Sequence, residues 1–85
     1  MEGFEVAPYF ERRVLNNPQC SHLIPYVADT VRYPEETLTQ SDGKVRHWRY
    51  VPELRYHIRV TTTGDGALFN AHEGSNYTRK KGRPE

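Results

Sequence analysis

Four side chains in the second half of the chain have the chemistry needed to move a proton beside a phosphate group. They are Arg46, His57, Arg59 and His72. An imidazole titrates near neutral pH, and a guanidinium offers two parallel hydrogen-bond donors to phosphate oxygens. Because side chains alternate along a strand, His57 and Arg59 should project from one face of the strand that we expect at 56–63. We therefore take this face as the candidate catalytic surface.

The other two candidates should join from neighbouring strands. Arg46 lies in an expected strand at 44–51, and His72 ends an expected strand at 67–72. His72 is expected either to lie beside His57 as the second member of an acid–base couple or to be a residue at the rim of the sheet. The alternative is that these side chains only keep the solvent face of an antiparallel sheet soluble. Both interpretations remain open at this point.

The sheet that positions these residues is predicted from turns and alternation. The pairs Asp42-Gly43 and Asp65-Gly66 mark tight turns, and Pro52 to Arg55 connects the two longer strands. Alternation in the strand at 56–63 places Ile58 and Val60 on the inner face. The alternation in the strand at 44–51 does not decide which face is buried. We place Val45 and Val51 inward, because the opposite face, with Arg46, Trp48 and Tyr50, then forms the more coherent polar surface.

Two helices should cover the inner face. Apolar residues recur every three or four positions at Ala7, Phe10 and Val14, which predicts an amphipathic helix over 4–16. The same spacing predicts a second helix over 23–32, and residues 35–40 form either a short edge strand or an extended linker. The predicted fold class is therefore α+β, with two N-terminal helices packed on a three- to four-stranded antiparallel sheet.

The charge of the chain is unevenly distributed. The 85 residues have a formal net charge of +1, but the segment after Tyr77 is strongly basic, so the rest of the chain is net acidic. We expect a single domain over 1–74 and a basic, flexible tail over 75–85. Tyr50 is a candidate for stacking on a nucleic-acid base. The basic residues of the tail are candidates for phosphate contacts: Arg79, Lys80, Lys81 and Arg83. Trp48 is expected to pack in the core rather than to stack on a base.

Composition excludes several classes of function. The single cysteine, Cys20, cannot form an intramolecular disulfide, and the four histidines lack the close spacing of a zinc site. No apolar run is long enough to span a bilayer, and the N-terminus lacks the pattern of a signal peptide. We expect a cytoplasmic protein with no metal, no cofactor and no membrane partner.

One segment resembles a known family. The residues that carry the resemblance are Asp42-Gly43-x-Val45-Arg46-x-Trp48-x-Tyr50-Val51-x-Glu53-Leu54, then Arg59-Val60, Asp65-Gly66 and Asn70-Ala71. Together with the layout of two helices before a sheet, they resemble a poorly characterised group of the small RelE/ParE-like toxin superfamily of bacterial toxin–antitoxin pairs. That group has an aromatic residue and Asp-Arg-Arg after the Asn-Ala pair, where this chain has His72 to Ser75.

The resemblance implies an endoribonuclease that acts on RNA, free or on the ribosome, and that is held inactive by a cognate antitoxin protein. Such enzymes drive a ribose 2′-oxygen onto the adjacent phosphate, which suits the four candidate catalytic residues. The sequence leaves open a non-enzymatic module that binds nucleic acid or protein through the same basic and aromatic face. It also leaves open gyrase inhibition, which would not need the histidines. The chain is therefore a candidate enzyme, and its function has to be argued from the site.

Overall fold

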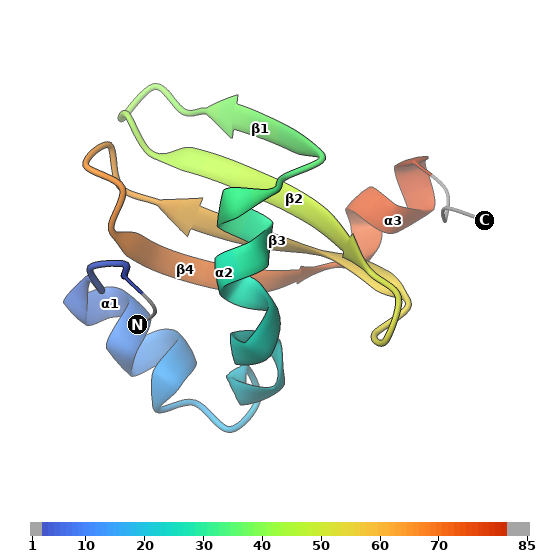
Figure 1. Ribbon diagram of the computed structural model, residues 1–85, viewed down its shortest axis with the longest axis horizontal. Coiled ribbons are helices and arrows are strands. Elements are labelled where there is room, and N and C mark those ends of the chain that lie inside the picture. The colour runs from blue at the N-terminus through green and yellow to red at the C-terminus, as the bar shows by residue number, and fades with distance from the viewer. Residues whose placement is uncertain (1–2, 82–85) are drawn as a thin grey trace.

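Four antiparallel strands form the centre of the fold, and helices lie on both sides of them (Figure 1). The computed structural model describes residues 3–81. The strands are β1 (Glu36–Thr39), β2 (Val45–Val51), β3 (Tyr56–Thr62) and β4 (Leu68–Gly74), and they pair in chain order as a meander. The sequence prediction of an α+β fold with two helical segments before an antiparallel sheet is confirmed, and the edge strand at 35–40 is present as β1.

The first helical segment begins later than expected. The prediction was a helix over 4–16, whereas α1 (Pro8–Phe10) continues directly into a π-helical turn, η1 (Glu11–Leu15). The preceding residues instead pair with the first residue of β4: the amide of Ala7 donates to the carbonyl oxygen of Leu68 at 2.9 Å, and the amide of Leu68 donates to the carbonyl oxygen of Glu5 at 2.8 Å. Pro8 lies in the first turn, where its missing N–H costs nothing.

The second helical segment follows the prediction closely. A 3-10 turn, η2 (Ser21–Leu23), leads into α2 (Ile24–Arg32), which crosses one face of the sheet (Figure 1). Pro25 lies in the first turn of α2 and Tyr33 ends it. Leu23 and Val27 are fully or almost fully buried under the helix, and Val31 packs against the same apolar cluster. The spacing of four between these residues therefore marks the buried stripe of the helix.

The core lies between the helices and one face of the sheet. It is formed by residues from both layers, namely Phe10, Val14, Leu23, Val27, Val51, Ile58, Val60, Leu68 and Ala71. The register aligns His47 with Val60 and Arg49 with Ile58, so these two polar residues of β2 also face the helices. His47 is buried with its Nδ1 3.0 Å from the carbonyl oxygen of Val60, and Arg49 extends to donate to the carbonyl oxygen of Tyr33 at 2.7 Å. The inward placement of Val51 is confirmed, and the polar residues beside it are hydrogen-bonded.

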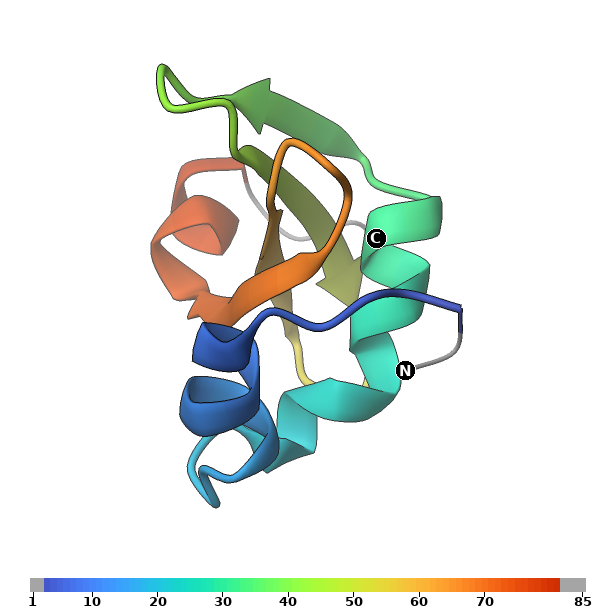
Figure 2. The same ribbon diagram turned by 90° about the vertical axis from the view of Figure 1, so that its left-hand side faces the viewer.

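A third helix, α3 (Ser75–Lys81), lies on the opposite side of the sheet from α2 (Figure 2). The sequence predicted a flexible tail from residue 75, whereas this segment is a helix that contacts β3. The remainder of that expected tail, 82–85, lies outside the described residues. None of the helices within residues 3–81 combines the length and the apolar character needed to cross a membrane.

Gly74 permits the close approach between β4 and β3 from which α3 departs. A Cβ atom at this position would lie 2.8 Å from the carbonyl oxygen of His57. We expect Gly74→Ala to lower the free energy of unfolding by about 1–3 kcal/mol, because the added methyl group forces the backbone apart. Chemical denaturation followed by circular dichroism measures the change.

Gly64→Ala is the matched control for this substitution. Its Cβ atom would lie 3.4 Å from the carbonyl oxygen of Gly43, an ordinary contact, so we expect a change below about 1 kcal/mol. Equal effects of the two substitutions would contradict a specific role for the approach at Gly74.

Candidate functional site

The sheet face away from α2 carries its side chains in rows that run across the strands. The register aligns Trp48 with Arg59 and Arg59 with His72, which gives one row across β2, β3 and β4. The next row contains Arg46, Thr61 and Asn70. We call this surface the open face. Directly opposed residues of an antiparallel pair have Cβ atoms about 5 Å apart, so each row brings side chains from three strands into reach of one another.

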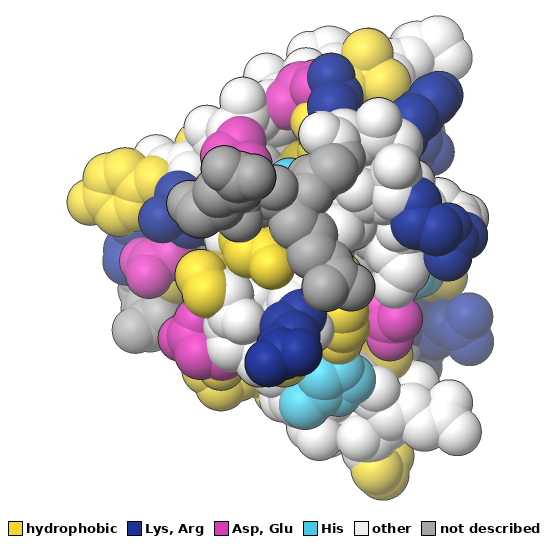
Figure 3. All heavy atoms as spheres, turned by 90° about the vertical axis from the view of Figure 1, so that its right-hand side faces the viewer, with side chains coloured by type: hydrophobic (Ala, Val, Ile, Leu, Met, Phe, Trp, Pro, Cys, Tyr) yellow, Lys and Arg dark blue, Asp and Glu magenta, His cyan; other side chains and the backbone are white. Residues whose placement is uncertain are grey.

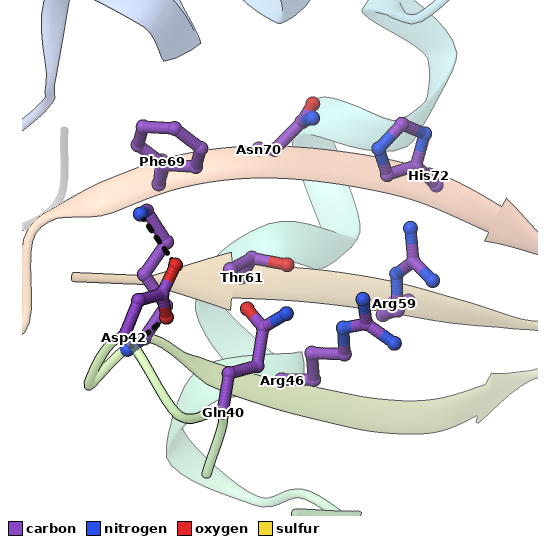
Figure 4. Close-up of a pocket in the computed structure, with 9 residues that line it drawn as sticks. Gln40, Asp42, Arg46, Arg59, Thr61, Phe69, Asn70 and His72 are labelled. Atoms are coloured by element: carbon purple, nitrogen blue, oxygen red, sulfur yellow. Dashed lines mark hydrogen bonds and ion pairs between the residues drawn. The ribbon is translucent and has the colours of Figure 1, made fainter. Parts of the chain in front are cut away.

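A hollow of about 220 Å³ lies over the two rows. Figure 4 shows the guanidinium groups of Arg46 and Arg59 side by side within it, with His72 next along the line. The residues that line it are Gln40, Asp42, Lys44, Arg46, Arg59, Thr61, Phe69, Asn70 and His72. We call this the cationic hollow, because three of its side chains are basic, namely Lys44, Arg46 and Arg59, and only Asp42 is acidic.

Within the described part of the chain, no carboxylate neutralises the two arginines. Asp42 is already paired, because its Oδ2 lies 2.9 Å from the Nζ of Lys44. The Nε of Arg59 is buried without a hydrogen-bond partner. Burial and the neighbouring charge of Arg46 lower the pKa of Arg59, although a guanidinium remains protonated at any physiological pH. Two neighbouring guanidinium groups that are partly desolvated and have no carboxylate partner favour binding of an anion that carries several oxygens.

His72 is the titratable group of the cationic hollow that can exchange a proton near neutral pH. Partial burial lowers the pKa of His72 below its ordinary value of 6.5, and the positive charges of Arg59, Arg13 and Arg46 lower it further. The imidazole is therefore predominantly neutral at pH 7 and has a free lone pair. A neutral imidazole beside two guanidinium groups can accept a proton from a hydroxyl group bound there.

The other end of the open face is covered by α3, and His57 is buried beneath it with 3% of its surface exposed. Its backbone amide donates to Oγ1 of Thr78 at 2.6 Å, and its Nδ1 lies 2.9 Å from the same oxygen. Its Nε2 lies 3.3 Å from Oε1 of Glu35. Both ring nitrogens are thus occupied by neighbours. His57 anchors α3 to the sheet and does not line the cationic hollow.

Aromatic stacking completes the attachment of α3. The rings of Trp48 and Tyr77 stack with centroids 5.1 Å apart, and Tyr77 also meets the ring of His57 edge to face at 4.8 Å. The hydroxyl of Tyr77 donates to Oε1 of Glu36 at 2.5 Å, and the Nζ of Lys81 lies 3.4 Å from the same oxygen. Burial, followed by the hydrogen bond to Glu36, raises the pKa of Tyr77 to about 12. The phenol is therefore protonated at neutral pH and acts as a donor.

The structure brings together three of the four predicted catalytic residues. Arg46, Arg59 and His72 meet at the cationic hollow, whereas His57 lies apart from it. The expected couple of His72 with His57 is not formed, because β4 pairs with β3 in a register that sets His72 opposite Arg59 and Gly74 opposite His57. The alternation within β3 was sufficient to assign its two faces, but it could not predict this offset between strands.

The predicted nucleic-acid-binding residues are dispersed. The ring of Tyr50 meets His57 edge to face at 5.2 Å and does not line the cationic hollow. Arg79, Lys80 and Lys81 lie on α3, where Arg79 donates to the side chain of Asn76, and Arg83 lies outside the described residues. Figure 3 shows the end of the molecule that carries α3, and in its coloured part acidic side chains lie among the basic ones. None of the three described tail cations lines the cationic hollow.

Sequence reasoning missed the residues that hold α3 in place, among them Glu36, Tyr77 and Thr78. A signal was present, because Ser75 directly follows Gly74 and serine is a favoured residue at the start of a helix. Trp48 is buried, with 9% of its surface exposed, but it is covered by α3 and not by the two N-terminal helices. The prediction of a packed Trp48 therefore holds for its burial and not for its location in the core between sheet and helices.

Comparison with other proteins adds no relative. The chain matches no family model, no curated protein and no solved structure. Within residues 3–81, the side chains of His, Cys, Asp and Glu do not gather in groups that could hold a metal ion. The cationic hollow is therefore the feature from which a function can be inferred.

The lowered pKa of His72 is directly testable. We expect His72 to titrate below 6.5 in the folded protein, and we expect Arg59→Gln to raise its pKa part of the way back, because burial remains the largest cause. Since the unfolded chain binds this proton more readily, the contribution of His72 to the free energy of unfolding falls as the pH drops through 6.5. NMR titration of the His72 ring measures the pKa. Arg12→Gln removes a different cation and should leave it unchanged, and a wild-type pKa at or above 6.5 would contradict the geometry.

The contact between Tyr77 and Glu36 can be tested in the same way. We expect the Tyr77 ring to titrate near 12, so that its contribution to stability is complete below about 10 and is lost as the pH rises toward 12. Glu36→Gln should lower this pKa but leave it above 10, because burial remains. NMR of the Tyr77 ring provides the measurement, with Glu53→Gln as the control. An unchanged pKa in Glu36→Gln would show that the hydrogen bond is absent in solution.

Proposed function

We propose that this protein is a toxin-type endoribonuclease of the cytoplasm that binds RNA across the open face. The observation that carries the proposal is the unneutralised pair Arg46 and Arg59 beside a predominantly neutral His72. An RNA phosphodiester combines oxygens for two guanidinium groups with a neighbouring ribose 2′-hydroxyl group that can become a nucleophile. The resemblance of residues 42–71 to RelE/ParE-like toxins points in the same direction.

The residues have distinct roles in the proposed reaction. His72 takes the proton from the ribose 2′-hydroxyl, and the 2′-oxygen then attacks the adjacent phosphorus atom. Arg46 and Arg59 hold the phosphate oxygens and stabilise the negative charge that builds up on them. The bond from phosphorus to the 5′-oxygen breaks, and that oxygen takes a proton from solvent, which can enter the open hollow. The products are a 2′,3′-cyclic phosphate and a free 5′-hydroxyl.

A partner that neutralises the cationic hollow follows from the same charges. An antitoxin segment that places a carboxylate between Arg46 and Arg59 would pair both guanidinium groups and exclude RNA. The exposed edge strand β1 borders this region, and Leu38 on it is 51% exposed. We propose a cognate protein whose acidic residues cover the hollow and whose apolar residues cover Leu38.

A second candidate function is a non-enzymatic module that binds nucleic acid through the same hollow. The position of His57 favours it, because this second histidine is held beneath α3 and leaves His72 as the single histidine of the cationic hollow. Such a module would bind RNA and release it uncut. Measuring binding and cleavage separately distinguishes the two functions.

The experiment compares wild type with Arg59→Ala and His72→Ala, both by induction in a bacterium at matched soluble expression and with purified protein. We expect growth arrest and RNA cleavage by the wild type. His72→Ala should reduce cleavage about a hundredfold and retain RNA binding, since it removes the proton acceptor, whereas Arg59→Ala should reduce both. The readouts are RNA fragment ends and a binding assay at several salt concentrations.

Arg12→Ala and His22→Ala are the matched controls, because they remove the same side-chain types from exposed positions away from the cationic hollow. Both should retain wild-type activity. Binding by the wild type without cleavage would replace the nuclease by the binding module. Absence of both from a well-folded wild type would refute the proposed function.

A further inference from the structure

A second hollow adjoins the cationic hollow and has a different chemical character. Its volume is about 270 Å³, and Arg59 and His72 line both hollows. Its remaining walls come from Trp48, from Asn76 and Tyr77 of α3, and from the end of β4. We call it the aromatic hollow. The two hollows are thus neighbours that share one wall, formed by the row that contains Arg59 and His72.

The spacing of the two hollows follows from the strands. Arg46 and Trp48 lie two residues apart on one face of β2, so their Cα atoms are separated by roughly 6.5–7 Å. This separation is comparable to that between the phosphate and the base of one nucleotide. A nucleotide whose phosphate lies on Arg46 and Arg59 can therefore reach the aromatic hollow with its base.

The walls of the aromatic hollow suit a nucleobase. Trp48 and Tyr77 form a stacked aromatic pair at one side, and bases pack favourably against aromatic side chains. Asn76 and His72 supply an amide and an imidazole, which can hydrogen-bond to the polar edge of a base. Tyr77 is fixed by its hydrogen bond to Glu36, so the wall is preformed and little ordering is needed on binding.

We infer that the aromatic hollow binds the unpaired base of the nucleotide whose phosphate occupies the cationic hollow. This inference rests on the proposed function, because it takes RNA as the ligand. It adds that the ligand is single-stranded at this nucleotide and that α3 forms part of the binding surface. Asn76 contributes to base recognition, and it is a binding residue that does not contact the phosphate.

The single tryptophan of the chain makes the inference measurable. Trp48 lines the aromatic hollow but not the cationic hollow, so its fluorescence reports on one of them, while the NMR signal of the His72 ring reports on both. The probes are inorganic phosphate and the four nucleoside 3′-monophosphates. We expect phosphate to shift the His72 signal without changing the Trp48 emission. At least one nucleotide should change both the His72 signal and the Trp48 emission, and it should bind about tenfold more tightly than phosphate.

Two variants locate the effect. Asn76→Ala should remove most of the tenfold advantage of the nucleotide and leave phosphate binding unchanged. Gln19→Ala removes an exposed amide elsewhere and should change neither affinity. Both positions are exposed, so we expect the variants to fold, and circular dichroism checks this.

The outcomes separate this inference from the proposed function. Equal affinity for phosphate and all four nucleotides, with unchanged Trp48 emission, would overturn the base-binding hollow and leave the phosphate site intact. A tenfold advantage that persists in Asn76→Ala would overturn the role of Asn76. Absence of any response to phosphate and nucleotides would overturn the inference together with the phosphate site on which it rests.

Discussion

The antiparallel register of β2 and β3 is the constraint on which the rest of the structure depends. Because side chains alternate along a strand, the pairing that buries Ile58 and Val60 against the helices must place His57 and Arg59 on the other face. A slip of one residue would bury Arg59 and expose the core. The apolar core and the charged open face are therefore two results of one register, and neither can change without the other.

The helix α3 divides the open face into a half whose side chains have hydrogen-bond and packing partners and a half in which such partners are missing. Under α3, His57 has partners on both ring nitrogens and Trp48 is covered by Tyr77. Beyond α3, Arg59 lies beside another cation and keeps a buried Nε without a partner. Polar groups that serve only stability are usually hydrogen-bonded, so this contrast within one sheet is the reason for placing the proposed phosphate site on the uncovered half.

The two edges of the sheet make different contacts. Residues 5–7 pair with Leu68 at the β4 edge, which protects part of that edge and ties the N-terminal segment to the sheet. The β1 edge is short, and Glu36 on it holds Tyr77 and Lys81. A small domain has little apolar area to stabilise it, so these links between distant segments contribute more than they would in a larger protein.

The sequence by itself determined the α+β class, the second helix and the two faces of β3, because the period of two in β3 and of four in α2 reflects local geometry. It singled out four catalytic candidates because imidazole and guanidinium groups suit proton transfer beside a phosphate: Arg46, His57, Arg59 and His72. The structure buries His57 beneath α3. The sequence did not determine that His72 faces Arg59 rather than His57, since the offset between β3 and β4 depends on how the whole sheet packs. Nor did it show that 75–81 folds back as α3, because that helix is held by Glu36, Trp48 and His57. These residues lie far from it in sequence, and only the tertiary structure brings them together.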